Sequence, residues 1–514
     1  MTGLNGGGRF DWQTLRSRVA RGLGACSMAL LASSAGCSDA AATPDLSPRE
    51  PSELRRAASP DGPAAAALMT REQPAPRDGL ATERAPDASA RLREAVQVAE
   101  PAELELAPIP AAREPIAIRT ARQRLTVRIA PDHGAPRRAR IPRGESFEVF
   151  ELVEGRGCEG KGWADVGNGG FVCLANSRKA SAAPRTMPAV DGDGVMPFYF
   201  ASIPQGETAR RWSSLASYRR GDEPRSISAP GTHFAFESRF RDKGQIVFLD
   251  PRGRVMLEQD LRRYRPSTFA GHDLEASPVP RQQTLGWAVS WPETMVYATP
   301  DAEGELYEVL DYHAEIYVKP QPVQAANSTW YELVDGGFIS ARNLRRFEPP
   351  AALPDEALAD DEVWLDIELD EQVLTVMRGS TPVFATLVST GLKGPTPRGL
   401  FRINKKEAFG SMSSAPGAVY TYAVEAVPYV QYFHGGIALH SAYWHDRFGH
   451  EASHGCVNLS PQDSAYVYSL TSPHPRDGWI EVYEDEGDLG TRVRVRRGDA
   501  QVADRRGPVE YVQG

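Results

Sequence analysis

A repeated pattern constrains the fold of this 514-residue chain more than any other feature of its sequence. Trp163 precedes a Gly-Gly-Phe triplet that ends at Phe171, and both residues recur at Trp330 and Phe338. The interval is the same for the Trp and the Phe, and the Asn and Arg that close the first pattern recur at that interval too. Repetition at a fixed interval indicates duplicated supersecondary modules.

Short alternating runs around both patterns predict β-strands, with Gly and Pro residues between them. We therefore place one small β module at 122–180 and a second at 293–348. Their Trp and Gly-Gly-Phe residues resemble bacterial SH3-like barrels, which implies either wall or partner binding or a structural spacer. Residues 190–290, between the modules, contain further strand-like runs and are predicted to form a β-rich insert of unknown type that packs on the two modules.

The N-terminal residues 1–37 predict an export signal. Three arginines precede an apolar run at 22–36, which is too short for an ordinary membrane span. The run ends at Cys37 in a sequence that resembles a lipoprotein processing site, although Ser34 stands where the usual pattern has Leu. The resemblance implies lipidation of Cys37, a membrane anchor through that lipid, and a periplasmic or cell-envelope location. An ordinary cleaved signal is the alternative.

Composition divides the rest of the chain. No Phe, Tyr or Trp occurs between Trp12 and Phe147, and the Ala/Pro-rich residues 38–121 are predicted to be a disordered linker. A second linker is predicted at 349–360, and a loose charged tail at 486–514.

Two of the five cysteines lie close together within the first module, at Cys158 and Cys173. Export into an oxidising compartment would allow them to form a disulfide. The net charge of −9 shows no broad basic field, so we predict no nucleic-acid partner.

The last part of the chain concentrates histidines around one cysteine. Cys456 lies in the sequence Ser-His-Gly-Cys-Val-Asn at 453–458, and four of the ten histidines fall within the sixteen residues before it. A thiolate is the attacking form of cysteine, and a nearby imidazole can take the thiol proton and lower the thiol pKa. The cluster therefore predicts nucleophilic catalysis by Cys456.

This motif resembles the signature of the L,D-transpeptidases, the cysteine enzymes that cross-link bacterial peptidoglycan. His440 matches their upstream histidine, and Thr396 begins a Thr-Pro-x-Gly-x-Phe segment that matches a second family motif. The resemblance covers residues 361–485 and implies a mainly β, sandwich-like catalytic domain with a short helix after Cys456. Ser460, followed by Pro, predicts the start of that helix.

The resemblance also implies a reaction and its residues. Cys456 would be the nucleophile of a peptidoglycan L,D-transpeptidase, forming a thioacyl-enzyme on a donor stem peptide with release of D-Ala before transfer to an acceptor stem. His440 would be the proton donor and acceptor, oriented by the carbonyl of Ser441 or of a neighbouring residue, and no cofactor is implied. Backbone groups of His454 and Gly455 would form the oxyanion hole. The predicted substrate-pocket residues are Ser441, Tyr443, Trp444, Ser453 and Asn458.

Three alternatives stay open at this point. Water in place of an amine acceptor would make the enzyme an L,D-carboxypeptidase, and loss of activity would leave a wall-binding lipoprotein. Zinc bound by the histidines and Cys456 is the third. The five-residue steps from His440 to His445 to His450 do not place two imidazoles on one helical face, and no acidic ligand motif accompanies them, so we predict no metal.

Overall fold

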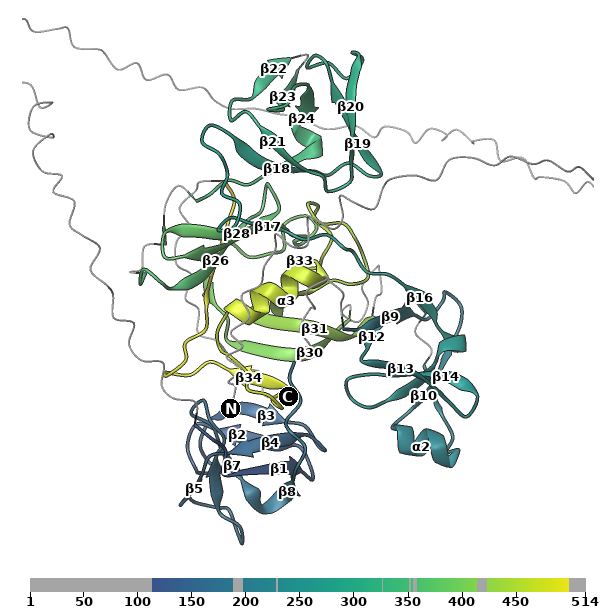
Figure 1. The fold of residues 1–514 in the computed structure, drawn as a ribbon, viewed down its shortest axis with the longest axis vertical. Helices are drawn as coiled ribbons and strands as arrows, with labels where there is room; N and C mark the ends of the chain where they lie inside the picture. Colours follow the sequence, from purple (N-terminus) through teal and green to yellow (C-terminus); the bar gives the residue numbers. More distant parts are fainter. Residues whose placement is uncertain are drawn as a thin grey trace, which may run out of the picture. The chain divides into compact units, whose positions relative to one another are not determined.

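The computed structural model describes residues 113–187, 197–227, 230–325, 327–350, 353–354, 358–413 and 423–498. These residues form mainly β-strands, as the sequence predicts, with two α-helices and three 3-10 turns (Figure 1). The predicted signal peptide with Cys37, and the linker up to residue 112, lie outside the described residues. Within the part of the chain that the structure describes, no helix is both long and apolar enough to cross a membrane.

The first repeat forms a module of short antiparallel strands. Its strand β1 pairs on one edge with β4 and on the other with β8. Because β1 lies within 38–121, the predicted end of the disordered linker is wrong: backbone pairing on both edges orders this strand although it has no aromatic residue. The elements are β1 (Ala117–Ala121), β2 (Leu125–Arg128), β3 (Arg137–Ile141), β4 (Ser146–Val149), β5 (Glu151–Val153), β6 (Trp163–Asp165), β7 (Phe171–Cys173), η1 (Leu174–Asn176) and β8 (Ser177–Ala180).

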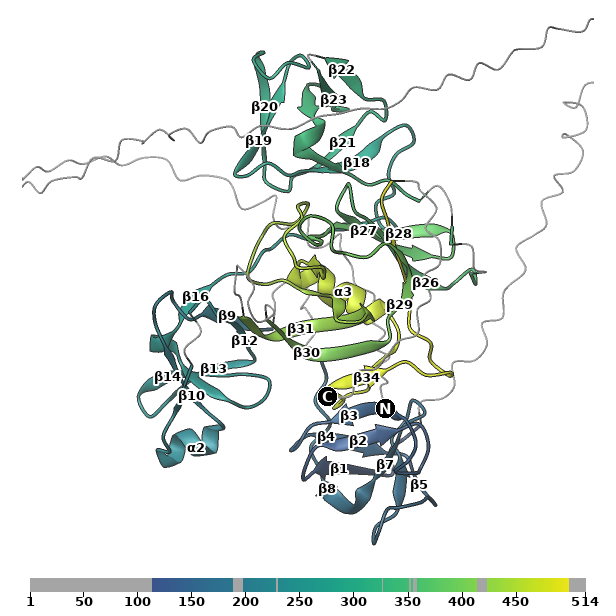
Figure 2. The ribbon, with the colours of Figure 1, turned by 180° about the vertical axis from the view of Figure 1, so that it is seen from behind.

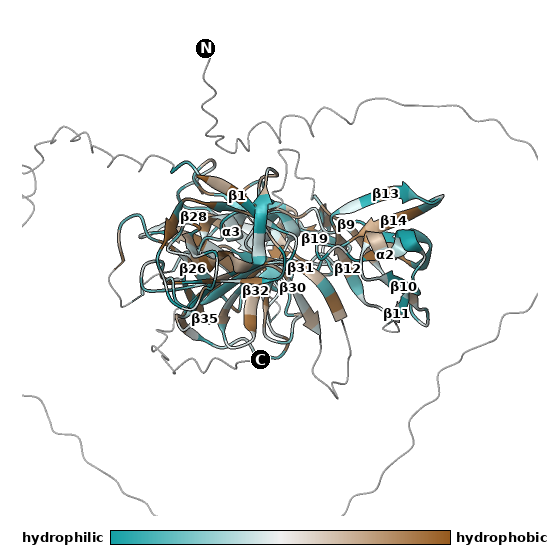
Figure 3. Ribbon diagram, turned by 90° about the horizontal axis from the view of Figure 1, so that it is seen from below, coloured by the Kyte–Doolittle hydropathy of each residue, from teal (hydrophilic) through white to brown (hydrophobic). Residues whose placement is uncertain are grey.

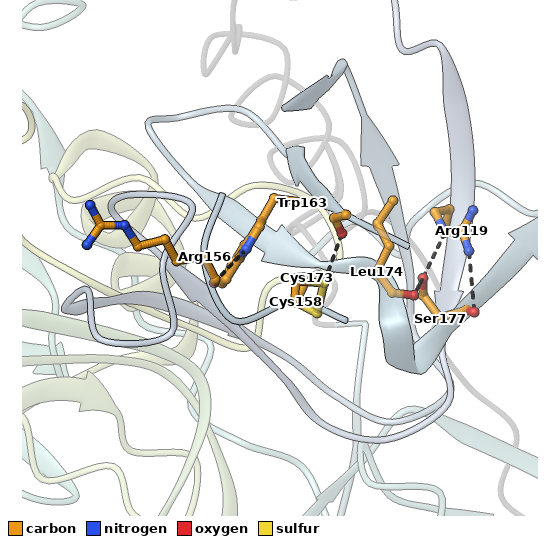
Figure 4. Close-up of a disulfide and its surroundings, with 8 residues drawn as sticks. Arg119, Arg156, Cys158, Trp163, Cys173, Leu174 and Ser177 are labelled. Atoms are coloured by element: carbon orange, nitrogen blue, oxygen red, sulfur yellow. Dashed lines mark hydrogen bonds between the residues drawn. A yellow bond between two sulfur atoms is a disulfide. The ribbon is translucent and has the colours of Figure 1, made fainter. Parts of the chain in front are cut away.

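A disulfide and a buried tryptophan hold the loop that precedes β6. Cys158 is bonded to Cys173, across a sequence separation of 15 residues (Figure 4). Trp163 is buried, and its Nε1 donates a hydrogen bond of 3.0 Å to the carbonyl of Arg156 (Figure 4). The disulfide connects the Gly-rich loop before β6 to β7, and the Trp163 hydrogen bond connects the same loop to β6.

The second repeat reproduces this arrangement at the interval seen in the sequence. β18 begins at Thr284, one repeat interval after the first residue of β1, and pairs with β21 and β25 as β1 pairs with β4 and β8. The predicted start of this module at 293 is therefore wrong, because residues 284–288 form a strand of the module and not the end of the insert predicted at 190–290. The elements are β18 (Thr284–Ala288), β19 (Glu293–Tyr297), β20 (Leu306–Asp311), β21 (Glu315–Val318), β22 (Val323–Ala325), β23 (Ser328–Glu332), β24 (Phe338–Ser340), η3 (Ala341–Asn343) and β25 (Leu344–Arg346).

The insert between the modules is β-rich, and it pairs with the last domain rather than only packing on the modules as predicted. Its β12 runs parallel to β31, with His233 opposite Val424, and its β17 pairs with β28. The elements are β9 (Tyr199–Ser202), β10 (Ala209–Trp212), α2 (Leu215–Arg220), β11 (Arg225–Ile227), β12 (His233–Phe236), β13 (Ser238–Asp242), β14 (Gln245–Leu249), β15 (Val255–Leu257), η2 (Glu258–Asp260), β16 (Arg262–Tyr264) and β17 (His272–Asp273).

The last domain combines strands of two sheets with one helix. One sheet has the order β17-β28-β27-β26-β35-β29, and in the other β31 pairs with both β30 and β32, which in turn pairs with β33. Leu365, Val376 and Val495 from the first sheet meet Leu439 and Val457 from the second in one apolar core. Figure 3 colours the strands of both sheets by the hydropathy of their residues. The elements are β26 (Val363–Glu368), β27 (Val373–Arg378), β28 (Thr381–Leu387), β29 (Gly399–Arg402), β30 (Lys405–Ser413), β31 (Ala423–His434), β32 (Ile437–Ser441), β33 (Val457–Leu459), α3 (Pro461–Leu470), β34 (Glu481–Tyr483) and β35 (Arg492–Arg496).

The beginning of the charged tail predicted at 486–514 is part of this domain. β35 lies parallel to β26, and Arg494 and Arg496 each donate to Asp366, at 2.6 and 2.8 Å. Asp366 is only 1% exposed. The arginines suggested a solvated segment, but they neutralise a buried carboxylate.

The predicted helix after the cysteine motif is confirmed as α3. Ser460 caps it by accepting the N–H of Asp463 at 3.1 Å. At its other end the fully buried Lys406 donates from Nζ to the carbonyls of Tyr468 and Thr471, both at 2.7 Å. The helix packs against β31, β32 and β33, which fixes the strands that carry the histidine and cysteine motifs (Figure 2).

The first module and the last domain share a sheet. β34 lies between β30 and β3, with Val482 opposite Ala139 and Glu481 opposite Arg140 (Figure 1). Trp479 and Val482 belong to the apolar core of the first module. The module is therefore joined to the last domain through backbone hydrogen bonds as well as side-chain packing.

Candidate active site

Two neighbouring parallel strands carry the motif histidine and the residues that directly follow the motif cysteine. In the register of β32 and β33, Leu439 lies opposite Val457 and His440 opposite Asn458. Leu439 and Val457 point into the apolar core. Since side chains alternate along a strand, His440 and Asn458 point to the other face. Cys456 directly precedes β33 on the same face as Asn458, so residues distant in sequence converge there.

The thiol of Cys456 lies against the start of β32. Its Sγ is 3.9 Å from the carbonyl oxygen of Gly436, and the side chain is half-buried. Burial raises the pKa of the Cys456 thiol, and a backbone hydrogen bond from Ala438 offsets part of this effect. The sequence predicted a lowered thiol pKa, which is wrong for this conformation because desolvation outweighs the interactions that favour the thiolate. The thiol is thus protonated at neutral pH and needs a base.

His440 has the properties of such a base. The residue is 3% exposed, and its Nδ1 lies 3.1 Å from the carbonyl oxygen of Ser441. An acceptor at this position fixes the proton on Nδ1 and leaves Nε2 with a lone pair. Burial lowers the pKa of His440 to about 4, against the smaller opposing effect of the Ser441 carbonyl. The imidazole is therefore neutral at pH 7 and able to accept a proton.

Hydrogen bonds hold the turn before Cys456. Ser453 Oγ donates to the Cys456 carbonyl at 2.5 Å and accepts the N–H of Gly455 at 3.0 Å, while Thr396 Oγ1 donates to the Gly455 carbonyl at 2.9 Å. The N–H of Gly455 is thus engaged here, contrary to its predicted place in the oxyanion hole. Gly455 has φ of +135°, and a Cβ there would lie 2.6 Å from Ile437 Cδ1, so the position requires glycine. The His454 side chain is exposed.

The aromatic residues after His440 have different surroundings. Trp444 is half-buried and stacks on the His440 ring, with centroids 5.7 Å apart, so it forms a wall beside the imidazole. Tyr443 is 1% exposed and donates from its hydroxyl to the Glu425 carbonyl at 2.7 Å. Its predicted place in the substrate pocket is wrong, because it is a core residue that supports Trp444 from behind.

A second histidine lies beside Asn458. The Nε2 of His445 is 2.8 Å from the Asn458 side-chain amide, and its Nδ1 accepts the backbone N–H of Arg447 at 3.1 Å. Burial is the main cause that lowers the pKa of His445 to about 4, and the nearby His440 and Arg447 add to it. His445 is therefore neutral and holds the strand that follows Cys456.

The comparisons with known proteins agree with this geometry. Residues 362–495 match the YkuD family, the L,D-transpeptidase catalytic domain. This part of the chain is an L,D-transpeptidase catalytic domain. It contains His440, Cys456 and α3.

Individual relatives are more distant. The L,D-transpeptidase domain is 27% identical over 130 residues to YciB of Bacillus subtilis (strain 168), a protein assigned as an L,D-transpeptidase. The match covers 22% of this chain and 63% of YciB, which is less than two thirds of that relative. A crystal structure of L,D-transpeptidase from Stackebrandtia nassauensis matches with 26% identity and a TM-score of 0.20, over 29% of this chain and 63% of that one. An L,D-transpeptidase from Mycobacterium smegmatis matches with 20% identity and a TM-score of 0.21, over 46% and 89%.

One residue near the thiol in the L,D-transpeptidase domain was missed by the sequence reasoning. Tyr432 on β31 lies opposite Ala438 of the neighbouring strand β32. Burial raises the pKa of the Tyr432 phenol, and the nearby Glu407 and Cys456 raise it further. Lys405 Nζ lies 4.1 Å from the centre of the Tyr432 ring. The alternation of residues along β31 was the available signal, but it does not show which strands become neighbours.

Three histidines of the L,D-transpeptidase domain make hydrogen bonds within the protein. His440 contacts the Ser441 carbonyl, His445 contacts Asn458, and His450 Nε2 is 2.7 Å from the Val289 carbonyl. Among the residues that the structure describes, no group of three or more His, Cys, Asp or Glu side chains is arranged to hold a metal ion.

Proposed function

We propose that this protein is a peptidoglycan L,D-transpeptidase in which Cys456 is the nucleophile and His440 the proton acceptor and donor. The observation that carries the proposal is the parallel pairing of β32 with β33, in which His440 lies opposite Asn458, two residues after the half-buried Cys456. The family of the domain supports the same assignment.

The proposed acylation uses His440 twice. Its Nε2 takes the thiol proton as Cys456 Sγ attacks the carbonyl carbon between the third, diamino residue of a stem peptide and the terminal D-Ala. The C–N bond then breaks, the proton passes from Nε2 to the departing D-Ala amine, and a thioester remains on Cys456.

Transfer repeats these steps with a second stem. The side-chain amine of the acceptor attacks the thioester carbonyl, and His440 takes a proton from the amine and returns one to the leaving thiolate. The product is an amide bond between two third residues, with a free thiol on Cys456. The N–H of Cys456 is the proposed donor to the oxyanion in both halves of the reaction.

The location of the enzyme is also a proposal. The apolar run at 22–36 and the processing-site resemblance at Cys37 support export and lipid anchoring in the cell envelope. Such an anchor would keep the catalytic domain close to the wall. Intact mass of membrane-extracted protein is expected to show a mature N-terminus at Cys37 carrying acyl chains, and a lipid-free N-terminus elsewhere would remove this part of the proposal.

The direct test is incubation of the exported chain with purified disaccharide tetrapeptides, followed by mass spectrometry. We expect dimers linked through two third residues, with release of D-Ala. Cys456→Ala should abolish them, His440→Asn should reduce them by about one-hundredfold or more, and His454→Asn, at an exposed ring, should have little effect.

Two results would contradict the proposal. Undiminished dimer formation by Cys456→Ala would exclude the cysteine mechanism. Tripeptide products without dimers would show that water is the acceptor and that the enzyme is a carboxypeptidase.

A further inference from the structure

The loop that joins the two catalytic strands is held by the second β module. We call residues 442–456 the catalytic loop. His313 Nε2 contacts the carbonyl oxygen of Phe448 at 3.0 Å, and Arg345 Nε donates to the carbonyl of Gly449 at 2.7 Å. In the opposite direction, His450 Nε2 contacts the carbonyl oxygen of Val289 at 2.7 Å. Three consecutive residues of the catalytic loop are thus bonded to the module.

Apolar packing accompanies these hydrogen bonds. Phe448 is fully buried and shares an apolar cluster with Val289 and Trp287 of the module. Gly449 has φ of +87°, and a Cβ at this position would lie 2.7 Å from Val289 Cγ1. The backbone of the catalytic loop therefore approaches the module as closely as the absence of a side chain allows.

The opposite side of the same segment is fixed by the catalytic domain. The N–H of Gly449 donates to the Val388 carbonyl at 2.9 Å, and Ser389 Oγ donates to the Arg447 carbonyl at 2.6 Å. Residues 447–450 thus lie between the end of β28 in the catalytic domain, which bonds 447 and 449, and the module, which bonds 448–450.

Hydrogen bonds through His445 and Asn458 connect residues 447–449 to the catalytic residues. The backbone N–H of Arg447 donates to His445, and the other nitrogen of His445 lies against the side chain of Asn458. Asn458 lies opposite His440 and two residues after Cys456. A shift of residues 447–449 would therefore move His445 and, through Asn458, the strand on which the thiol depends.

We propose that the second β module is a positioning element of the active site, and that Arg345 and His313 act on Cys456 by fixing the catalytic loop. The module is then more than a spacer or a wall-binding domain, because the active site is fully ordered only when the module is docked. This inference rests on the proposed role of Cys456, but its test does not require turnover.

The test uses Arg345→Met in the exported chain, which removes the donor to Gly449 and keeps most of the aliphatic stem. Arg342→Met is the matched control, since Arg342 lies exposed in η3, directly before the strand β25 that carries Arg345. The readouts are hydrogen exchange of the peptide that covers residues 445–452 and the rate and pH profile of Cys456 alkylation by iodoacetamide.

We expect Arg345→Met to speed exchange of that peptide by about tenfold to one-hundredfold, the range for a lost hydrogen bond to a charged donor. The Cys456 alkylation rate and its apparent pKa should change as well, whereas both readouts should match wild type in Arg342→Met. Arg345→Lys, which keeps a donor, should restore part of the effect.

A second variant covers the case in which Arg345→Met unfolds the module. His313 has φ of +66°, which asparagine tolerates, so His313→Asn removes the Nε2 contact without added backbone strain. His313→Asn should speed hydrogen exchange of residues 445–452, while exchange of β18 to β24 stays as slow as in wild type. Unchanged exchange and unchanged Cys456 alkylation in the variants that keep the module folded would overturn the proposal. If the variants shift Cys456 alkylation but the wild-type chain forms no dimers, the positioning role of the module is supported and the transpeptidase assignment is rejected.

Discussion

The buried, neutral His440 makes a quantitative prediction about acid stability. Its pKa falls from 6.5 to about 4 on folding. The unfolded chain then binds more protons than the folded one between pH 6.5 and 4, so the free energy of unfolding falls as the pH falls through this window. At about 1.36 kcal/mol for each pH unit, the loss from this residue is about 3 kcal/mol, complete below pH 4 and absent above pH 6.5.

His440→Asn isolates this contribution. The Nδ2 of asparagine lies near the position of the imidazole Nδ1, so the donor to the Ser441 carbonyl remains, but the side chain does not titrate. The variant should be less stable than wild type at pH 7 because the ring no longer packs on Trp444. Its disadvantage should shrink by about 3 kcal/mol between pH 7 and pH 4 and can reverse there.

The assay follows unfolding of the catalytic domain alone. Wild type and variant are equilibrated in a urea series at several pH values, pulsed with deuterated buffer, and the deuterium uptake of the peptide that covers β26 and β27 is measured by mass spectrometry. Other titrating groups cancel in the difference between the two proteins. A difference in unfolding free energy that stays constant from pH 7 to pH 4 would refute the claim that His440 is buried in its neutral form.

Three further outcomes are expected. Replacing Cys158 and Cys173 with serine should destabilise the first module by about 3 kcal/mol in urea unfolding, because the disulfide closes a 15-residue loop. Lys406→Met should destabilise the catalytic domain by removing a donor from two carbonyls at the end of α3. Burial holds the pKa of Lys406 well below its usual value, so the loss in unfolding free energy relative to wild type should grow from pH 7 to pH 10 in calorimetry. A loss that stays constant over this range would contradict the prediction. Gly455→Ala should lower turnover by about one-hundredfold, since its Cβ would displace Ile437 beside the thiol, and wild-type turnover would exclude the tight fit.

Local sequence signals predicted the local parts of the structure. The cap at Ser460 and the proline after it predicted α3, and the family resemblance implied a backbone carbonyl beside the His440 ring, which is that of Ser441. The constant interval between the two sequence repeats predicted equivalent strands in the two modules. The SH3-like resemblance of those modules stays a prediction.

The same sequence reasoning gave wrong predictions where the structure depends on non-local pairing or on burial. β35 looked like a solvated tail because the partner of its arginines, Asp366, lies 128 residues before Arg494. Tyr443 was predicted to line the pocket because it follows His440 closely in sequence, while the Glu425 carbonyl that binds its hydroxyl lies on a different strand. The raised pKa of Cys456 depends on desolvation, which no sequence motif reports.

The shared sheet of β3 and β34 has a consequence for anyone who would excise the catalytic domain. A fragment that spans only 362–495 would leave the outer edge of β34 unpaired and would expose Trp479 and Val482, which belong to the core of the first module. An open strand edge beside bare apolar side chains is a template for intermolecular pairing. Recombinant fragments for inhibitor screening should therefore begin before β1, because a shorter fragment would carry its own aggregation site.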